Sequence, residues 1–338
     1  MPELAPSSRP RRARWLPAFL RRWGISLGSL ASGLVTLLVF RRGLPHVGWL
    51  VGYVVALWVL FAVLTQGRAA LVRRGRRVVV RAGEYTIQTL YHGLLLFVLP
   101  GYFASTTFDG PTLPFFLVLV AVALLTTIDP WYQAVVDPRP WLGAALFAFA
   151  LFAGLNVALP LVGLSPGTAV LASAALAGIA LAPSWLRTRG GTAGGLGRAA
   201  VIAAVAALAA WVGRPAIPPA PLHLVGPVVA RGVLDLTPVD PVRRLTVTEL
   251  RAWGGLVAFT PVAAPAGLRQ PIEHRWRHDG RVVSTVRLAT PVEGGRSAGF
   301  RTYSRKADFP VAPAGRWTVD VLTASGQLIG RVRFRVDA

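Results

Sequence analysis

The sequence predicts a membrane protein in two parts, an all-α helical bundle of about seven spans and a C-terminal all-β, immunoglobulin-like sandwich. Apolar segments recur between Gly24 and Val212, near the length of about 20 residues that crosses a bilayer. Arginine gathers in alternate loops between them. After a proline-rich stretch, polar and apolar residues alternate as in strands. The 338 residues are 54% hydrophobic and only 15% charged, against about a quarter charged in soluble proteins.

Composition narrows the class of protein further. A net charge of +22 would indicate a nucleic-acid partner in a soluble chain. Here the arginines of the first two-thirds flank apolar segments, which is the distribution of membrane proteins, so we predict no nucleic-acid partner. The absence of cysteine excludes disulfides and cysteine-ligated metals. No pattern predicts a cofactor.

Residues 1–23 form a basic leader with six arginines. They are too long and too basic for the first region of a cleavable signal peptide. The apolar run that follows ends at Arg41-Arg42 without small residues that would mark a cleavage site. We therefore expect a cytoplasmic leader before the first span.

The helical domain is predicted over residues 24–212. Tryptophan and tyrosine flank many of its segments, as at membrane surfaces, and prolines fall at the segment ends. The expected spans are 24–40, 47–66, 85–104, 113–130, 141–163, 166–186 and 197–212. Alternatively, the segments 141–163 and 166–186 together form one re-entrant excursion, and the chain then has six spans.

Loop charges predict the orientation. With residue 1 in the cytoplasm, the inner segments 1–23, 67–84, 131–140 and 187–196 hold 15 arginines. The outer segments hold only two, Arg41 and Arg42. Because arginine-rich loops stay on the cytoplasmic side, the N-terminus is predicted to be inside. Seven crossings place everything after Val212 outside.

Residues 213–221 are predicted as a proline-rich, semi-rigid linker, and residues 222–338 as the sandwich. The segment 271–278 alternates, with Ile272, His274 and Trp276 on one face, and Asp279-Gly280 is a hairpin turn. A returning strand, 281–288, is expected to place Val282, Val286 and Leu288 inward. A second alternating pair, joined by a turn that contains Gly326, closes the chain. Several short strands at this spacing predict a sandwich.

The stretch Pro271 to Val336 resembles a known domain. The similarity is carried by the His-x-Trp segment, the Asp-Gly turn, the run Gly299-Phe300-Arg301-Thr302-Tyr303-Ser304-Arg305-Lys306, and Gly315-Arg316-Trp317 before the final hairpin. It resembles the domain of unknown function twenty-nine fourteen, which is found at the C-terminus of uncharacterised bacterial multi-pass membrane proteins. The resemblance implies a bacterial source and a β-rich domain outside the membrane, and it implies no substrate. Together with the orientation that the loop charges predict, it leads us to expect a bacterial inner-membrane protein whose β-domain is periplasmic.

One candidate site is a polar pocket among the helices. Glu84, Gln88 and His92 follow one another at helical spacing, and Asp129 is expected near the same membrane surface. Ionisable groups in membrane segments usually have partners or a function. The alternative is that they are ordinary polar residues at helix ends.

A second candidate is an anionic-ligand patch. Arg331, Arg333 and Arg335 lie on the polar face of the last strand, and Arg301 and Arg305, with Lys306, are expected nearby. Arginine suits phosphate and carboxylate groups, so lipid phosphates or acidic envelope polymers are the expected ligands. The alternative is an edge strand protected by charge from aggregation.

No catalytic motif is present, and His274 and His278 lack a third ligand, so no metal site is predicted. We therefore expect a non-enzymatic envelope protein that presents a binding or sensing β-domain. Its partners would be the lipid bilayer and an anionic lipid, an envelope polymer or another envelope protein. The rivals are a small-molecule transporter or channel, and a membrane enzyme that acts on lipids through Glu84, His92 and Asp129.

Overall fold

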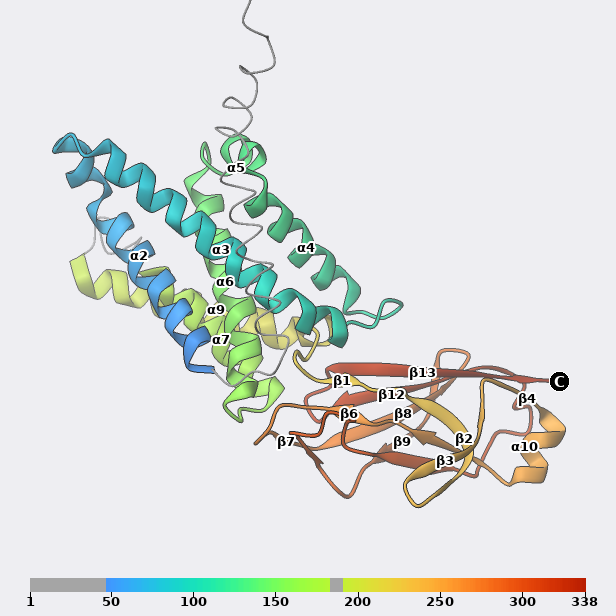
Figure 1. Cartoon of the computed structure of the whole chain (residues 1–338). Helices are drawn as coiled ribbons and strands as arrows, with labels where there is room; N and C mark the ends of the chain where they lie inside the picture. Colours follow the sequence, from blue (N-terminus) through green and yellow to red (C-terminus); the bar gives the residue numbers. More distant parts are fainter. Residues whose placement is uncertain (1–46, 183–190) are drawn as a thin grey trace, which may run out of the picture.

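The computed structural model describes residues 47–182 and 191–338, and it divides them between a helical domain and a β-domain (Figure 1). The helices lie side by side at one end of the molecule, and the strands form the other end. The predicted leader 1–23 and the first predicted span, 24–40, lie outside the described residues.

Each predicted apolar segment from residue 47 onward contains a helix. Most helices begin or end at the prolines, and Ser165 caps one of them by accepting a hydrogen bond from the backbone N–H of Thr168 at 3.3 Å. The helices are α2 (Val47–Arg73), α3 (Arg77–Ser105), α4 (Leu113–Thr127), α5 (Asp129–Val135), α6 (Pro140–Leu161), α7 (Pro166–Ala180) and α9 (Gly191–Gly213), followed by the 3-10 turn η2 (Arg214–Ala216).

Fewer spans are found than predicted. Among the described residues, three stretches are long and apolar enough to cross a membrane: 78–105, 140–161 and 197–216. A fourth results if α4 and α5 are counted as one broken span. The helix α7, predicted as 166–186, has only 15 residues, which is short of the roughly 18–20 that a bilayer needs. The expectation of seven spans is therefore supported only in part.

The predicted span 113–130 is bent. The helix α4 ends at Thr127, Ile128 adopts an extended conformation, and α5 departs at an angle of 100°. Pro130 stands in the first turn of α5, where its fixed backbone favours a helix start rather than a continuation. Pro130 therefore explains why the helix breaks here, but it does not determine the angle between α4 and α5.

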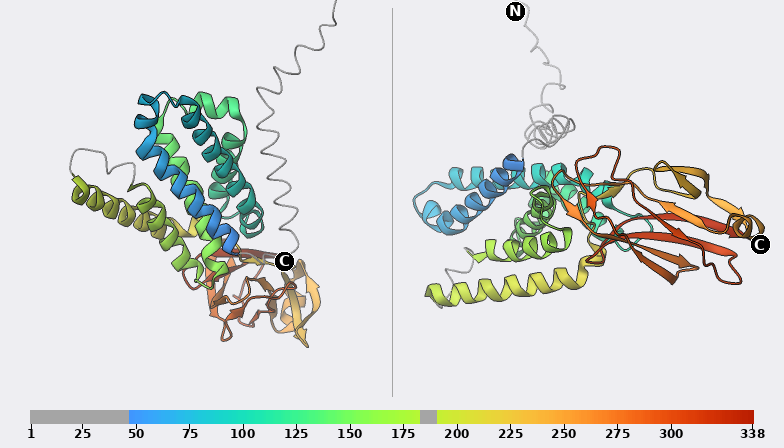
Figure 2. Two further views of the ribbon diagram at one scale, coloured as in Figure 1. Left: turned by 60° about the vertical axis from the view of Figure 1, so that its left-hand side comes forward. Right: turned by 90° about the horizontal axis from the view of Figure 1, so that it is seen from below.

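Small residues and large apolar side chains share the helical core. The side chains of Leu57, Leu95 and Phe147 are fully buried there. Gly178 of α7 lies against the backbone of α9, because a Cβ built on it would be 2.9 Å from the Cα of Ala203. Such close approach is how small residues pack membrane helices. Both views of Figure 2 show α9 at the outer side of the helical domain.

The β-domain is a sandwich-like arrangement of two main sheets. One sheet has the order β11-β5-β2-β3 and the other β4-β13-β12-β8-β9. Its elements are β1 (His223–Leu224), β2 (Val228–Leu234), β3 (Thr237–Val242), β4 (Arg244–Thr246), α10 (Val247–Trp253), β5 (Leu256–Phe259), β6 (Val262–Ala263), β7 (Arg269–Gln270), β8 (Ile272–His278), β9 (Arg281–Arg287), β10 (Val292–Glu293), β11 (Tyr303–Lys306), β12 (Gly315–Thr323) and β13 (Leu328–Asp337).

Alternation decides which side chains enter the sandwich. Trp276 of β8, Trp317 and Val319 of β12 and Phe334 of β13 are buried between the sheets. Asp279 and Gly280 both have positive φ, as a two-residue hairpin turn requires. A bulge between Trp276 and Arg277 then shifts the register of β9, so Val282 is paired with Arg277 and half exposed. The expectation that Val282 points inward is wrong for this reason.

The two domains are in contact. The residues between α9 and β1 lie against the β12–β13 turn, where the Arg214 Nε donates to the Ser325 carbonyl at 2.6 Å and the Gln327 Nε2 donates to the Ile217 carbonyl at 3.2 Å. In the same segment, Ala220 belongs to the helical core and Leu222 to a core cluster of the sandwich. The β-domain therefore rests on the helix ends that carry the α3–α4 and α6–α7 loops (Figures 1 and 2).

Candidate anion-binding groove

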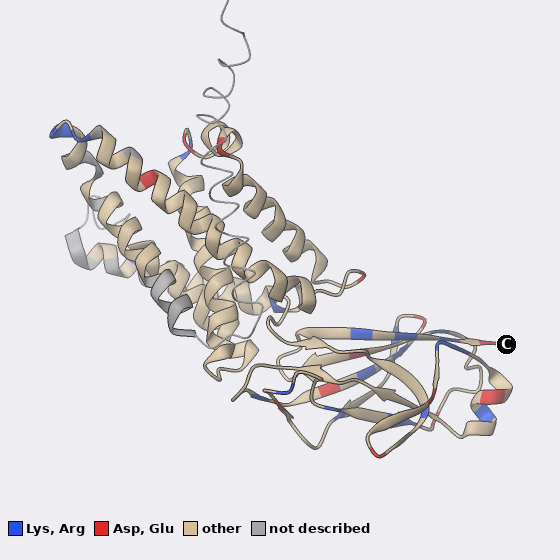
Figure 3. Ribbon diagram, in the orientation of Figure 1, with Lys and Arg blue, Asp and Glu red and all other residues tan. Residues whose placement is uncertain are grey.

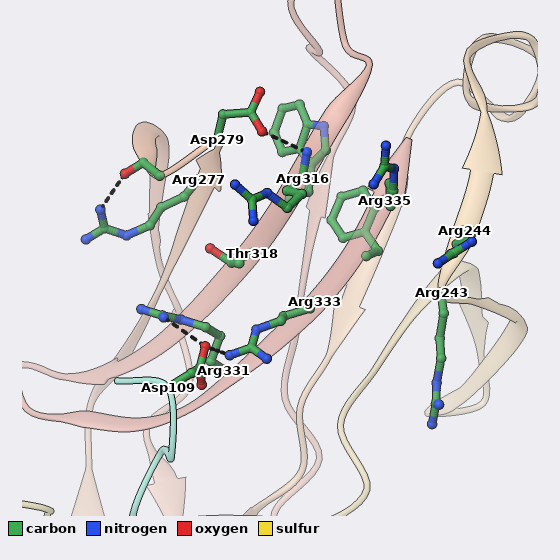
Figure 4. Close-up of a pocket in the computed structure, with 13 residues that line it drawn as sticks. Asp109, Arg243, Arg244, Arg277, Asp279, Arg316, Thr318, Arg331, Arg333 and Arg335 are labelled. Carbon is green, nitrogen blue, oxygen red and sulfur yellow. Dashed lines mark hydrogen bonds and ion pairs between the residues drawn. The ribbon is translucent and has the colours of Figure 1, made fainter. Parts of the chain in front are cut away.

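Arginine side chains converge in a groove on the outer face of the five-stranded sheet (Figure 4). The groove has a volume of about 740 Å³ and runs beside β12 and β13, between β4 and the α3–α4 loop. Its charged lining residues are Asp109, Arg243, Arg244, Arg277, Asp279, Arg316, Arg331, Arg333 and Arg335.

Strand register brings these residues together. On β13 the arginines occupy every second position, so all three share the face opposite to the core. Their partners on β12 are Asp320 for Arg331, Thr318 for Arg333 and Arg316 for Arg335. The strand β8 adds Arg277, which is paired with Thr318.

Asp320 fixes two of the arginines. Its side chain is only 4% exposed. It accepts hydrogen bonds from the Arg277 Nε at 2.9 Å and from both the Nε and the Nη2 of Arg331. A buried carboxylate with two guanidinium partners holds both in defined orientations. The groove therefore has two arginines that are positioned before any ligand arrives.

Asp109 enters the groove from the helical domain. It lies in the α3–α4 loop, and its Oδ2 is 3.4 Å from the Nη1 of Arg331 and forms an ion pair with Arg333. Figure 4 shows this carboxylate between the ends of the two arginines. The contact joins residues more than 200 positions apart and links the two domains electrostatically.

Positive charge exceeds negative charge in the groove. Seven arginines line it, against the two carboxylates of Asp109 and Asp279 in the lining and two more beside it, Asp320 paired with Arg277 and Arg331 and Asp337 paired with Arg335. Within the part of the chain that the structure describes, no carboxylate lies within 4 Å of the guanidinium groups of Arg243, Arg244 and Arg316. Clustered like charges repel, and a bound anion removes that repulsion.

A second hollow of about 730 Å³ adjoins the first. It is lined by the apolar residues of β2 and β3 and by four residues that also line the groove, Asp109, Arg243, Arg331 and Arg333. Asp109 and its two arginine partners thus stand between the two hollows.

The structure divides the predicted arginine patch. Arg331, Arg333 and Arg335 line the groove, as their spacing on one strand suggested. Arg301 and Arg305 do not, because β11 belongs to the other sheet and both side chains are exposed on its outer face. Arg305 instead donates to the Gly254 carbonyl at 3.4 Å.

Four further arginines of the groove were not predicted. Arg277 and Arg316 stand at alternating polar positions of strands that the sequence does reveal, so the signal was present. Arg243 and Arg244 lie at the start of the short parallel strand β4, and pairing of distant segments is not visible in local patterns. Asp109 lies in a helix loop and gives no signal.

The polar residues of the helices are partly assembled. The Gln88 Nε2 donates to the Asp129 Oδ1 at 2.8 Å and to the Thr126 carbonyl at 3.2 Å. The His92 Nδ1 lies 2.7 Å from the Thr127 hydroxyl. Glu84 lies one turn earlier on α3 with an exposed side chain. Gln88 therefore contacts both sides of the α4–α5 break, and His92 contacts its α4 side.

His274 and His278 lie apart from the groove's arginines. His274 is fully buried, with its Nε2 2.9 Å from the Thr260 hydroxyl and its Nδ1 2.8 Å from the Ser304 hydroxyl. This burial lowers the pKa of His274 to about 4. The ring of His278 stacks on Trp317 at 4.5 Å. Both histidines thus take part in packing the sandwich.

The groove is suited to binding rather than to proton transfer. Guanidinium groups stay charged at all physiological pH values, so they cannot act as general acids or bases. They can hold phosphate or carboxylate oxygens through paired N–H donors. Among the described residues, no three His, Cys, Asp or Glu side chains are grouped so that they could hold a metal ion.

Comparison with protein families gives two matches. Residues 8–258 match a family of unknown function (DUF5924), and residues 269–336 match proteins of unknown function (DUF2914). The second match confirms the resemblance of the C-terminal stretch. The boundary between them crosses the sandwich, since β2 to β4 lie in the first match and β8, β9, β12 and β13 in the second. Neither curated proteins nor solved structures give a match.

Proposed function

This chain belongs to DUF5924, a family of unknown function, and we propose a function from the geometry of the groove. The protein is a non-enzymatic membrane protein that presents an immunoglobulin-like sandwich outside the cytoplasm. There the arginine groove binds an anionic group of a lipid, an envelope polymer or another envelope protein. The DUF2914-type residues 269–336 supply most of the groove's arginines.

One observation carries the proposal, the convergence of seven arginines in one groove. The alternative is that the arginines only protect a sheet edge from aggregation, for which scattered charges are enough. That role does not explain the buried Asp320, which orients Arg277 and Arg331. Oriented guanidinium groups lower the cost of binding, because little side-chain freedom is lost when the ligand arrives.

The proposed membrane placement follows from the charges. The α2–α3 loop, with Arg73, Arg74 and Arg76, lies at the end of the helices away from the sandwich, whereas the middle of the helical domain carries few charges (Figure 3). In the proposed arrangement the arginine-rich end is cytoplasmic. The proposal counts seven crossings, with 24–40 as the first, the bent α4–α5 pair as the fourth and the short helix α7 as the sixth. This count gives a periplasmic sandwich in a bacterial inner membrane.

A pair of fusions tests the placement. A reporter that is active only outside the cytoplasm is attached after Ala338, and in the control it is attached in the α2–α3 loop at Gly75. We expect activity from the first fusion and none from the second. The reverse pattern would overturn the proposed orientation and, with it, the envelope partner.

A binding experiment tests the groove. Full-length protein in detergent micelles is titrated with phosphate, sulfate and citrate by calorimetry. The triple variant Arg316→Gln, Arg333→Gln, Arg335→Gln should lose about tenfold or more in affinity for the anions that bind. The control Arg231→Gln, Arg301→Gln, Arg305→Gln removes the same charge from the opposite sheet and should lose less than about twofold. Equal losses in the two triple variants would contradict the proposal.

A second candidate function is ion transport through the helical domain. It is favoured by one observation, the break between α4 and α5 with Gln88 hydrogen-bonded to Asp129 at that point. Broken helices with polar residues form binding sites in transporters. Flux of protons or sodium ions into vesicles, lost in Asp129→Asn and kept in Asp137→Asn, would support transport, and the absence of flux in wild-type vesicles would exclude it for these ions.

A further inference from the structure

We propose that the arginine groove is a phosphate site in which Asp109 occupies the position of the ligand, so that a phosphate group and the α3–α4 loop compete for Arg331 and Arg333. The inference rests on the proposed function, because it names the chemical class that the groove binds. It adds a consequence for the junction between the two domains.

The carboxylate of Asp109 marks the binding position. One of its oxygens contacts both Arg331 and Arg333, which is how a ligand oxyanion would bind between two guanidinium groups. Arg331 is already held by Asp320 through its Nε and Nη2, so its Nη1 is the donor that remains directed at the groove. Arg333 has the carboxylate of Asp109 as its ion-pair partner.

The charge count favours phosphate over a single carboxylate. Four carboxylates, those of Asp109, Asp279, Asp320 and Asp337, lie in or beside the groove and leave three of its seven positive charges uncompensated. A phosphate monoester carries about two negative charges at neutral pH and has three terminal oxygens that accept hydrogen bonds. It can therefore engage Arg331 and Arg333 and still present an oxygen to a further donor, whereas a carboxylate has only two oxygens.

Size also favours a group larger than the aspartate. Asp109 stands between two hollows of about 740 and 730 Å³, and both are lined by Arg243, Arg331 and Arg333. Withdrawal of this side chain joins the two hollows and leaves space on both sides of the arginine pair. A phosphate attached to an organic group fits such a space better than an isolated ion.

The loop that carries Asp109 is a compact turn. The backbone N–H of Thr107 donates to the Thr112 hydroxyl at 3.0 Å, and the N–H of Gly110 donates to the Thr107 carbonyl at 2.8 Å. These bonds lie within the loop, so they survive its displacement. We therefore expect the loop to leave the groove as a unit when phosphate displaces Asp109, with loss of the packing of Gly110 against Leu328 of β13.

Phosphate can arrive from two sources, a lipid headgroup or a soluble ester. The headgroup source is physically accessible, because aromatic residues typical of a membrane surface lie at this end of the helices. Phe103 and Phe108 are more than half exposed beside the loop, and Arg214 lies over the exposed ring of Trp211 at 3.7 Å. The experiments below separate the two sources.

The first experiment measures competition. Full-length protein in nanodiscs of phosphatidylcholine is titrated with glycerol 3-phosphate. The variant Asp109→Asn should bind about fivefold or more tightly than the wild type, because the internal competitor has lost its charge. The control Asp240→Asn removes an equal charge from an exposed ion pair with Arg231 on β2 and should change the affinity less than about twofold. Arg333→Gln should weaken binding in both backgrounds.

The second experiment identifies the source. The same variants are reconstituted in nanodiscs that contain either phosphatidylcholine alone or one-third phosphatidic acid. If the headgroup occupies the groove, phosphatidic acid should reduce the affinity for glycerol 3-phosphate in the wild type, and it should do so more strongly in Asp109→Asn. An unchanged affinity identifies a soluble phosphate ester as the ligand, and both results uphold the phosphate site.

The third experiment follows the loop. The chain contains no cysteine, so Pro111→Cys and Val311→Cys introduce a unique pair of sites for spin labels, both on exposed residues. Saturating glycerol 3-phosphate should lengthen or broaden the distance distribution between the labels. The distribution should be displaced in the same direction in Asp109→Asn without ligand.

The failures are distinguishable. If citrate or sulfate binds through the groove arginines but glycerol 3-phosphate and phosphatidic acid do not, the phosphate site is refuted and the proposed anion-binding function stands. If phosphate binds with equal affinity to the wild type and to Asp109→Asn, the competition is refuted. If no anion binds in a way that depends on these arginines, both proposals fall together.

Discussion

The helical domain and the sandwich use apolar side chains in opposite ways. On the helices, large apolar residues remain outside: Val63, Leu117 and Val201 are each more than half exposed. In the sandwich, the largest apolar side chains, Trp276 and Trp317, are completely enclosed. Charged residues have the opposite distribution, since arginines are spread along the strands of the sandwich and gather at one end of the helices (Figure 3).

The contrast is what the proposed membrane location requires, with hydrocarbon around the helices and water around the sandwich. Apolar side chains on the outside are favourable in hydrocarbon, where helix contact depends on close packing and on a few hydrogen bonds. In water the same side chains must be buried, and their burial stabilises the sandwich by about 25 cal/mol for each Å² of apolar surface that is removed from water. Substitutions of the same chemical type should therefore have different effects in the two domains.

Tryptophan should show the largest difference. Trp317→Ala removes a ring that stacks on His278 and Phe334, together with the hydrogen bond from its Nε1 to the Pro313 carbonyl at 2.8 Å. We expect a loss of about 3–5 kcal/mol in the unfolding free energy of the sandwich, measured by resistance to thermolysin. Trp141→Ala on α6, where the ring is 69% exposed, is the control and should have little effect. Equal losses would contradict the proposed difference in solvent.

Acid should affect the sandwich through His274. Burial lowers its folded pKa to about 4, whereas the unfolded chain binds this proton near pH 6.5. Between these values the unfolded state holds more protons, so stability falls as the pH falls and is unaffected above about 6.5. The contribution approaches about 3 kcal/mol by pH 4. Thermal unfolding at pH 7 and pH 4.5 should reveal the loss in the wild type and a smaller one in His274→Gln, with His223→Gln as the control.

A single hydroxyl should have the smallest effect. The Tyr102 hydroxyl donates to the Ala153 carbonyl at 3.2 Å and accepts from the Asn156 Nδ2 at 3.0 Å, which links α3 to α6. Tyr102→Phe should cost about 1 kcal/mol in resistance to unfolding by sodium dodecyl sulfate. Tyr85→Phe on the same helix should cost less, because its hydroxyl forms no hydrogen bond among the described residues. A loss above about 3 kcal/mol would mean that polar contacts dominate this domain.

Local pattern was enough to predict where most elements lie. Long apolar runs gave the positions of α3, α6 and α9, because helix length and hydropathy are properties of contiguous residues. Alternation did the same for β8, β12 and β13. It failed at Val282, because a bulge depends on both strands of a pair and the pattern reports only one.

Long-range geometry explains the rest of what was missed. The bend at Ile128 depends on how α5 packs, and Asp129-Pro130 marks only that a helix ends there. Three groove arginines were predicted because they share β13. The others come from β4, β8 and β12, and Arg301 and Arg305 were assigned wrongly because sheet membership is not encoded in spacing. Asp109 joins the site only after two domains have docked.

If the sandwich binds a partner as proposed, the short connection after α9 restricts how it can reach that partner. Because Arg214 and Ile217 are bonded to the β12–β13 turn, this segment is a fixed bracket and not a swivel. A swivel would let the sandwich sweep a wide volume, at the cost of ordering it on each capture. A bracket keeps the arginine face at one height and one tilt. A partner must then approach the groove in the one orientation that the fixed sandwich offers. This restriction would exclude partners whose anionic group cannot reach that position.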